Sequence, residues 1–272
     1  MKQKLSRLPA PVLAGVVREK TVGAVKAEIK NCLYHGAGMI DLHLSCLEED
    51  DEESLKKIIE WSPLPILALH YTARTGKAAG RSEEERTETL FRAVRAGAAG
   101  LDMQGYTFHA PSRTAFCGED RYSFTKGGPC EVVTDSAIIE KQKAFIEKVH
   151  AEGAEVLLSC HPGIYLDRDQ VVDLALFLEQ RGPDLIKIVT VAHNEEELIE
   201  SFAAMLLLKK EVRVPVTYHA AGAAGKLSRV INPVLGGHIA FCVDRFKEGH
   251  ALEQLDLETA RKTVDGLKRI MQ

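Results

Sequence analysis

PDLIKIVTV, residues 183–191, begins with a turn-like Pro183 and Asp184 and continues as a run of β-branched and other apolar residues with a single charged side chain, Lys187, in its middle. A continuous apolar run of this length is typical of a strand that is buried on both faces, as in a parallel sheet. The stretch therefore predicts a parallel strand, and it raises the question of why such a strand would bury an amine.

Seven other apolar runs alternate with helix-period segments along the chain, which is typical of parallel strands joined by crossover helices. Eight strand–helix units in about 250 residues fit a (β/α)8 barrel (TIM barrel), whereas a doubly wound sheet usually has fewer strands. No linker divides the chain, so we predict a single α/β barrel domain over residues 1–272. The expected strands are Val12–Val17, Met39–Ser45, Ile66–Tyr71, Gly100–Gly105, Glu155–His161, Leu185–Val191, Pro215–Ala220 and His238–Val243.

One long connection, residues 106–135, has no clear periodicity and lies between the fourth expected strand and a helix that starts near Ser136. In a barrel such a segment leaves the carboxyl end of a strand, where active sites are found. We interpret it as a lid or a dimer arm. Its polar, glycine-rich composition leaves a disordered surface insertion as the alternative.

The composition argues against polyanionic partners. The chain has 272 residues, of which 45% are hydrophobic, and its 35 basic and 39 acidic residues nearly cancel. We therefore expect neither nucleic acid nor a membrane as partner. The apolar stretch near the N-terminus is too short for a signal or a membrane span, which favours a cytoplasmic location. The six cysteines form no CxxC pair, and we expect them to be reduced.

Lys187 is the first candidate catalytic residue. Side chains alternate along a strand, so Lys187 shares one face with Leu185 and Val189. If that face points into the barrel, the amine can reach the open end along the axis. Burial favours a neutral amine, which is the nucleophile that forms a Schiff base with a ketone. The alternatives are a lysine neutralised by a carboxylate and one that extends out of the sheet.

His161 is the second candidate, because it ends the expected fifth strand, where barrel enzymes place catalytic groups. Ser159 lies on the same face and is small, which leaves room for Lys187 from the adjacent strand. An imidazole beside a buried amine is a plausible proton shuttle, although a lone histidine is more often structural.

Three stretches together resemble type I 3-dehydroquinate dehydratase, a family of the class I aldolase superfamily. LLSCHPG (residues 157–163) and PDLIKIVTV are similar to its histidine and lysine strands, with 26 positions from His161 to Lys187. PVTYHAAGAAGKLSRV (residues 215–230) is similar, without a gap, to its seventh strand and following helix. The matching positions there are Pro215, Gly222, Gly225, Ser228 and Arg229.

The resemblance implies a Schiff-base lyase that dehydrates 3-dehydroquinate to 3-dehydroshikimate, a reaction of the shikimate pathway of aromatic amino acid biosynthesis. Lys187 would form the imine and His161 would serve as general acid and base. Arg229 would hold the substrate carboxylate, with Ser228 nearby and Gln254 as a further substrate contact. The resemblance also implies a homodimer, and it implies no cofactor and no metal.

The N-terminal half departs from the family pattern. Asp41 and His43 stand where the family has a substrate-binding glutamate and arginine, and Tyr71 stands where it has a second arginine. Pro162 replaces the acidic residue after the catalytic histidine, so either Asp41 or a loop residue would have to orient His161. Cations of the long loop could restore the lost charge: Arg113, Arg121 and Lys126.

Three other functions stay open at this point. The lost arginines fit an imine-forming aldolase or dehydratase that acts on a different hydroxy-ketone. A metal-dependent barrel hydrolase or isomerase would use histidines near strand ends, but no HxH or HExxH pair is present and Lys187 would be unexplained. A noncatalytic ligand-binding barrel is the third. The histidines that prompt the metal hypothesis are His43, His70, His109, His161 and His219.

Overall fold

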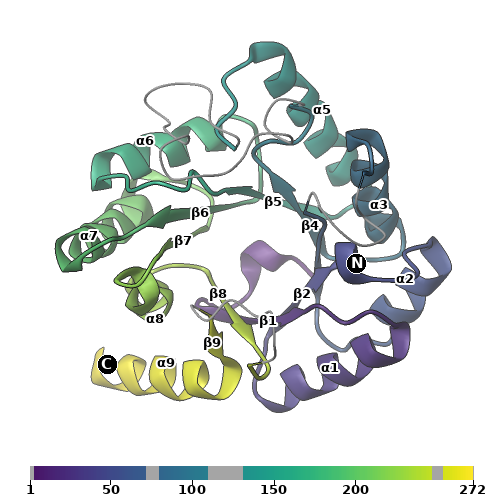
Figure 1. Cartoon of the computed structure of the whole chain (residues 1–272), viewed down its shortest axis with the longest axis horizontal. Coiled ribbons are helices and arrows are strands. Elements are labelled where there is room, and N and C mark those ends of the chain that lie inside the picture. The colour runs from purple at the N-terminus through teal and green to yellow at the C-terminus, as the bar shows by residue number, and fades with distance from the viewer. Residues whose placement is uncertain (1–2, 72–79, 110–130, 247–253, 272) are drawn as a thin grey trace.

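The computed structural model describes residues 3–71, 80–109, 131–246 and 254–271. Within these ranges nine strands form one parallel sheet in the order β7-β6-β5-β4-β3-β2-β1-β8-β9, and this sheet curls around an axis (Figure 1). The strands are β1 (Val12–Val17), β2 (Met39–His43), β3 (Ile66–Leu69), β4 (Gly100–Gln104), β5 (Glu155–Cys160), β6 (Leu185–Val191), β7 (Val216–Ala221), β8 (Ile239–Val243) and β9 (Leu255–Asp256).

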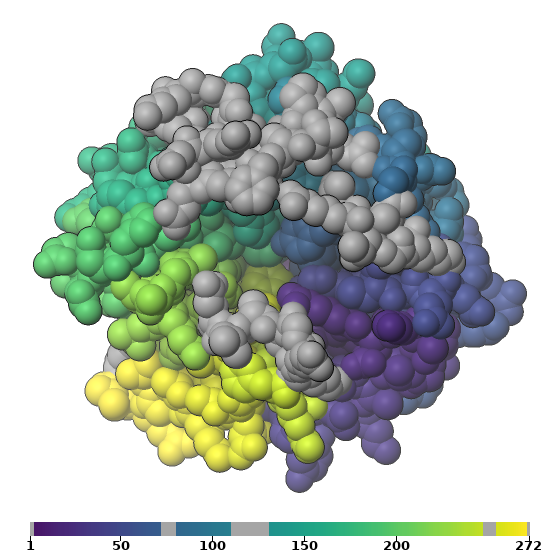
Figure 2. Space-filling model, viewed as in Figure 1, coloured from purple at the N-terminus to yellow at the C-terminus, as the bar shows by residue number. Residues whose placement is uncertain are grey.

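Two hydrogen bonds close the curled sheet between β7 and β8. The His238 N–H donates to the Val216 carbonyl at 2.9 Å, and the Ile239 N–H donates to Thr217 Oγ1 at 2.9 Å. On its other side β8 pairs with β1, so the C-terminal segment lies against the N-terminal one (Figure 2). The predicted (β/α)8 barrel is thereby confirmed. The short β9, which extends the sheet beyond β8, was not predicted.

Helices surround the strands, as Figure 1 shows. The start of α3 illustrates how the sequence sets a helix boundary. The Ser82 hydroxyl accepts from the Glu85 N–H and the Glu85 carboxylate accepts from the Ser82 N–H, which together form a capping box. The described helices are α1 (Val22–Tyr34), α2 (Glu52–Ile59), α3 (Glu83–Arg95), α5 (Ser136–Ala151), α6 (Arg168–Glu179), α7 (Glu195–Glu211), α8 (Ser228–Leu235) and α9 (Leu257–Met271).

The strands separate two apolar layers. One buried cluster takes its side chains from the strands and the N-terminal segment and fills the barrel interior, with Leu157 and Leu185 among its members. The other lies between the strands and the helices and includes Ile186 and Ile188. This alternation places Lys187 on the inner face of β6, as its spacing predicted.

The structure describes only the two ends of the long connection at 106–135. Its middle, with Arg113, Arg121 and Lys126, lies outside the described residues, so its predicted role as a lid or dimer arm stays a prediction. The returning end is fixed in place, because the buried Arg181 donates to the Val133 carbonyl at 2.8 Å. The next helix, α5, starts at Ser136 as expected.

The four described cysteines, Cys32, Cys46, Cys160 and Cys242, are free thiols, in agreement with the expected reduced state. Among the described helices we find none whose length and apolar character would suffice for a membrane span.

Candidate active site

A cavity opens where the carboxyl ends of the strands meet. Seven of the eight site residues predicted from the sequence line it, and only Ser228 does not. The cavity is lined by Arg18, Asp41, His43, Leu69, Tyr71, His161, Lys187, Val189, His219, Arg229, Phe241 and Gln254.

Lys187 lies in the floor of this cavity. Its Cα is paired in register with that of Ser159 on β5, so the small serine leaves the predicted space beside the lysine. The amine Nζ lies 3.6 Å from Asp102 Oδ2 and 4.7 Å from the centre of the Phe241 ring. The lysine is thus buried with a carboxylate beside it, yet its amine still faces the cavity.

Asp102 on β4 was not predicted as part of the site. Its carboxylate is completely buried, and Oδ1 accepts a hydrogen bond from the Ser159 hydroxyl at 2.5 Å. Burial raises the pKa of Asp102, while the positive charge of Lys187 acts in the opposite direction. Asp102 and Lys187 therefore form a coupled buried pair at the base of the cavity, which is the carboxylate partner that the sequence left open.

Glu131 orients His161. Its Oε2 lies 2.8 Å from His161 Nδ1 and also accepts from the His161 backbone N–H at 2.5 Å. A neutral imidazole that donates from Nδ1 presents the lone pair of Nε2 to the cavity. The group that orients His161 is therefore a residue of the long connection, one of the two possibilities left open by the sequence.

Gly105 makes room for Glu131 at the end of β4. A Cβ at position 105 would lie only 2.1 Å from the Glu131 carbonyl oxygen. Below this turn, Gln142 on α5 donates to the carbonyls of Gly105 and Thr107 at 2.9 and 2.8 Å, and Arg181 donates to Gln142 at 2.6 Å. The backbone on either side of this contact is thus held by two buried side chains, Gln142 on α5 and Arg181, which follows α6.

Tyr71 follows β3 and lies between the two predicted catalytic residues. Its hydroxyl is 3.4 Å from His161 Nε2 and 3.5 Å from Lys187 Nζ. Burial, followed by the negative charges of Asp102 and Glu131, raises the pKa of Tyr71 well above its ordinary value. The phenol therefore stays protonated in this setting.

Another part of the cavity wall is formed by two guanidinium groups, a histidine and an amide. Arg229 lies in the first turn of α8, and Arg18, which was not predicted from the sequence, follows β1. The Arg18 Nε is buried without a hydrogen-bond partner among the described residues, as is the Oε1 of Gln254. Burial and the charge of Arg229 lower the pKa of His219 well below its usual value, so that imidazole is neutral.

Asp41 and His43 on β2 are adjacent in the cavity. Asp41 Oδ2 lies 3.3 Å from His43 Nε2, and the His43 ring contacts the Tyr71 ring edge-on with 6.0 Å between centroids. The second oxygen, Oδ1, is buried without a partner among the described residues. It is therefore an unused acceptor that faces a small-molecule site.

Ser228 has a different place from the predicted one. Its hydroxyl is fully buried, accepts from the Ala220 N–H at 2.8 Å and donates to the Gly225 carbonyl at 2.6 Å. These bonds fix the turn between β7 and α8. Ser228 thereby positions the adjacent Arg229 instead of lining the cavity.

The histidines considered for a metal site are divided between two surroundings. Of the five, His43, His161 and His219 line the cavity, whereas His70 and His109 do not, and His70 lies 3.3 Å from an Arg81 guanidinium nitrogen. Across the described ranges, no group of three or more metal-ligating side chains has a suitable arrangement.

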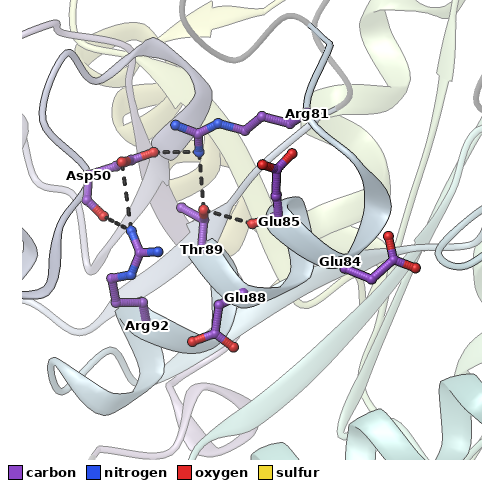
Figure 3. Close-up of a pocket in the computed structure, with 7 residues that line it drawn as sticks. All are labelled: Asp50, Arg81, Glu84, Glu85, Glu88, Thr89 and Arg92. Atoms are coloured by element: carbon purple, nitrogen blue, oxygen red, sulfur yellow. Dashed lines mark hydrogen bonds and ion pairs between the residues drawn. The ribbon is translucent and has the colours of Figure 1, made fainter.

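A second cavity lies on the outer side of α3 (Figure 3). Arg81 and Arg92 both turn toward Asp50, and Arg81 forms an ion pair with it at 2.5 Å. Glu84, Glu85 and Glu88 line the same depression. Both of its arginines are paired with Asp50, and its lining contains no lysine, histidine or cysteine, so the chemistry points to the barrel cavity.

Known proteins with similar sequences are 3-dehydroquinate dehydratases. The type I 3-dehydroquinase family model matches residues 14–270. The 3-dehydroquinate dehydratase of Desulfotalea psychrophila is 24% identical over 226 residues, which cover 83% of this chain and 85% of that protein. For the 3-dehydroquinate dehydratase of Aromatoleum aromaticum the identity is 28% over 104 residues, 38% of this chain. The match spans only 39% of that relative's length, and only 33% of the bifunctional dehydratase/dehydrogenase of Arabidopsis thaliana.

Solved structures show the same fold. The 3-dehydroquinate dehydratase of Geobacillus kaustophilus superimposes with a TM-score of 0.77 at 14% identity, over 100% of this chain and 98% of that one. The type I enzyme of Clostridium difficile also gives a TM-score of 0.77 at 14% identity, over 99% and 100% of the two chains. Since the family model covers nearly the whole barrel, the chain belongs to the type I 3-dehydroquinase family.

Proposed function

We propose that the protein dehydrates 3-dehydroquinate to 3-dehydroshikimate through an imine on Lys187. The observation that carries this proposal is the position of the Lys187 amine at the base of a barrel cavity, with the His161 imidazole and the Arg229 guanidinium in the same wall. The relatives, which are named 3-dehydroquinate dehydratases, suggest the substrate. The geometry supplies a nucleophile, an acid/base and an anion contact.

The reaction starts when the Lys187 amine adds to the substrate ketone. The resulting carbinolamine loses water and becomes an iminium ion, which withdraws electrons from the adjacent carbon. His161 Nε2 removes a proton from that carbon, and an enamine forms. The enamine expels the β-hydroxyl, which takes a proton from His161 and leaves as water. Hydrolysis of the conjugated iminium then releases the product and restores Lys187.

Two carboxylates support these steps from beneath the cavity. Glu131 accepts a hydrogen bond from the Nδ1–H of His161, which directs Nε2 toward the substrate and stabilises the imidazolium that forms when the α-proton is removed. Asp102 lies against Lys187 and balances the positive charge of the iminium. Both are positioning residues, since neither lines the cavity.

The cavity wall provides the contacts that a polyhydroxy carboxylate needs. Arg229 can bind the substrate carboxylate through two parallel hydrogen bonds. Arg18 supplies a second positive charge, which offsets the arginines that His43 and Tyr71 replace. Asp41 and Gln254 each present an oxygen that could accept a hydrogen bond from a substrate hydroxyl.

The first experiment is an ultraviolet assay of enone formation from 3-dehydroquinate, combined with borohydride trapping and intact-mass measurement. We expect turnover and a reduced covalent adduct on Lys187. The Lys187→Met variant should give no adduct, and His161→Ala should still form one while turnover falls by about 10²-fold or more. Trapping of ketones without dehydroquinate turnover would favour another hydroxy-ketone substrate. The absence of any adduct would overturn the imine mechanism.

A homodimer and a cytoplasmic location belong to the same proposal. Only the homodimer is implied by the resemblance, and it is tested by light scattering coupled to size-exclusion chromatography. A mass near 29.9 kDa, that of one chain, would contradict the homodimer.

A further inference from the structure

The Tyr71 hydroxyl lies between Lys187 and His161, the two residues that act on the substrate in the proposed mechanism. It lies 3.4 Å from His161 Nε2 and 3.5 Å from Lys187 Nζ. The described part of the chain contains no direct hydrogen bond between His161 and Lys187. Tyr71 is therefore the residue whose hydroxyl contacts both of these side chains.

The ring of Tyr71 is held in this position by its neighbours. It contacts the His161 ring edge-on, with centroids 5.9 Å apart and an interplanar angle of 69°, and it contacts His43 in the same way on β2. The backbone carbonyl of Tyr71 is also held, because it lies 3.0 Å from Nδ1 of the buried His70. Both the ring and the backbone are thus constrained with the hydroxyl directed at the reactive amine.

We propose that Tyr71 is a catalytic residue that relays a proton between Lys187 and His161. This inference rests on the proposed imine chemistry and adds a step to it. Lys187 Nζ lies at ion-pair distance from the Asp102 carboxylate, and an ammonium group paired in this way must lose a proton before its nitrogen can attack a ketone. The relay removes that proton without water having to enter the base of the cavity.

The relay conserves every atom and charge. One N–H bond of the Lys187 ammonium breaks as its proton moves to the Tyr71 oxygen, and the Tyr71 O–H bond breaks as its own proton moves to His161 Nε2. The phenol is unchanged at the end, and no electron is gained or lost. The products are a neutral amine and an imidazolium ion, which are the nucleophile and the acid that carbinolamine formation and dehydration require.

The surroundings of the Tyr71 phenol keep it protonated, so it can pass a proton on but does not remain ionised itself. Burial and the two nearby carboxylates, Asp102 and Glu131, raise the pKa of Tyr71, so a free phenolate is disfavoured. Glu131 on the far side of His161 stabilises the imidazolium that receives the proton. The proton therefore passes through Tyr71 and comes to rest on His161.

The test compares Tyr71→Phe, which keeps the ring and removes the hydroxyl, with Tyr218→Phe. Tyr218 is a matched control, because it is a buried tyrosine whose hydroxyl bonds Thr190 at 3.0 Å and does not line the cavity. Enone formation gives kcat and KM, and rapid borohydride quenching followed by intact mass gives the rate of adduct formation. We expect kcat and the adduct rate of Tyr71→Phe to fall at least about 10-fold, with KM changed less than about threefold. Tyr218→Phe should stay within about twofold of the wild type.

Other outcomes overturn the relay. A raised KM with an unchanged kcat would make Tyr71 a substrate contact only, and unchanged adduct and turnover rates would remove it from the mechanism. If the wild type itself formed no adduct, the proposed function would fail, independently of Tyr71. A proton inventory, in which the adduct rate of the wild type is measured in mixtures of H2O and D2O, provides a test without any variant. Transfer of two protons in the same step makes this rate a curved function of the deuterium fraction. A straight line would contradict the relay.

Discussion

Three of the proposed catalytic and substrate-binding residues each depend on a second residue that holds them in place. His161 is held by Glu131, Lys187 lies against Asp102, and Arg229 follows a turn that Ser228 fixes. Supporting residues of this kind commonly change activity by about 10- to 100-fold when they are removed. Substitution of these supporting residues therefore tests the proposed mechanism more sharply than substitution of the catalytic and binding residues alone.

Glu131→Gln should lower kcat by about 10- to 100-fold with little change in KM, because the amide no longer stabilises the imidazolium. The acid limb of the kcat/KM profile should also move to lower pH, a shift that a purely structural role would not produce. Gly105→Ala provides a second approach, since its Cβ would displace the Glu131 backbone. A Glu131→Gln enzyme with wild-type kcat and pH profile would remove Glu131 from the proposal.

Arg18→Met should raise KM for 3-dehydroquinate by about 10-fold or more while kcat changes by less than about threefold. A hydrogen bond to a charged group contributes about 1.5–3 kcal/mol, and this contact is expected to act equally in the ground state and the transition state. Arg213→Met is the control, because Arg213 is almost fully exposed and precedes β7, at the end of that strand away from the cavity. An unchanged KM in Arg18→Met would show that Arg229 alone binds the carboxylate.

At the level of the elements, the period of two along the strands carries most of the predictive information. It placed Lys187 and His161 on the inner faces of β6 and β5. The same rule could have found Arg18, because Val12, Ala14 and Val16 belong to the inner cluster and position 18 continues that face. Glu131 could not be found in this way. It comes from an irregular connection 30 residues before His161, and no periodicity relates the two.

The end of β3 should make the fold sensitive to acid. His70 is buried, its Nδ1 lies 3.0 Å from the Tyr71 carbonyl and its Nε2 lies 3.3 Å from Arg81 Nη1, so the ring is held in its neutral form. Burial, followed by the charge of Arg86, lowers the pKa of His70 from 6.5 to about 4. The unfolded chain therefore binds a proton below about pH 6.5 that the folded chain does not bind until about pH 4, and stability falls as the pH falls through this window.

The wild type should accordingly lose about 2 kcal/mol more free energy of unfolding than His70→Gln when the pH is lowered from 7.5 to 5.0. Urea unfolding followed by circular dichroism at the two pH values measures this difference. His219, whose pKa is also lowered by burial, titrates in the same direction in both proteins and cancels in the comparison. Equal pH dependence in the two proteins would show that His70 accepts its proton without cost to the fold.

At the scale of the whole molecule, the two ends of the barrel have different roles. The carboxyl ends of the strands surround the polar cavity, and the opposite end is closed by a short 3-10 helix at Leu5–Arg7. The Leu5 carbonyl lies 2.8 Å from His238 Nε2, and the Ser6 hydroxyl donates to the Glu155 carboxylate at 2.6 Å. This segment therefore connects β5 with the residue before β8, across the end of the barrel away from the active site.

Leu5→Ala should consequently reduce stability and leave catalysis intact. Leu5 is fully buried in the inner cluster, and truncation of such a leucine costs about 2–5 kcal/mol because it leaves a cavity. Urea unfolding should show this loss, while kcat and KM at 25 °C stay within about twofold of the wild type. Ile199→Ala, at a largely exposed position on α7, should cost less than about 1 kcal/mol. If Leu5→Ala instead changed KM without lowering the free energy of unfolding, the closed end of the barrel would be coupled to the substrate cavity. The two ends would then not have separate roles.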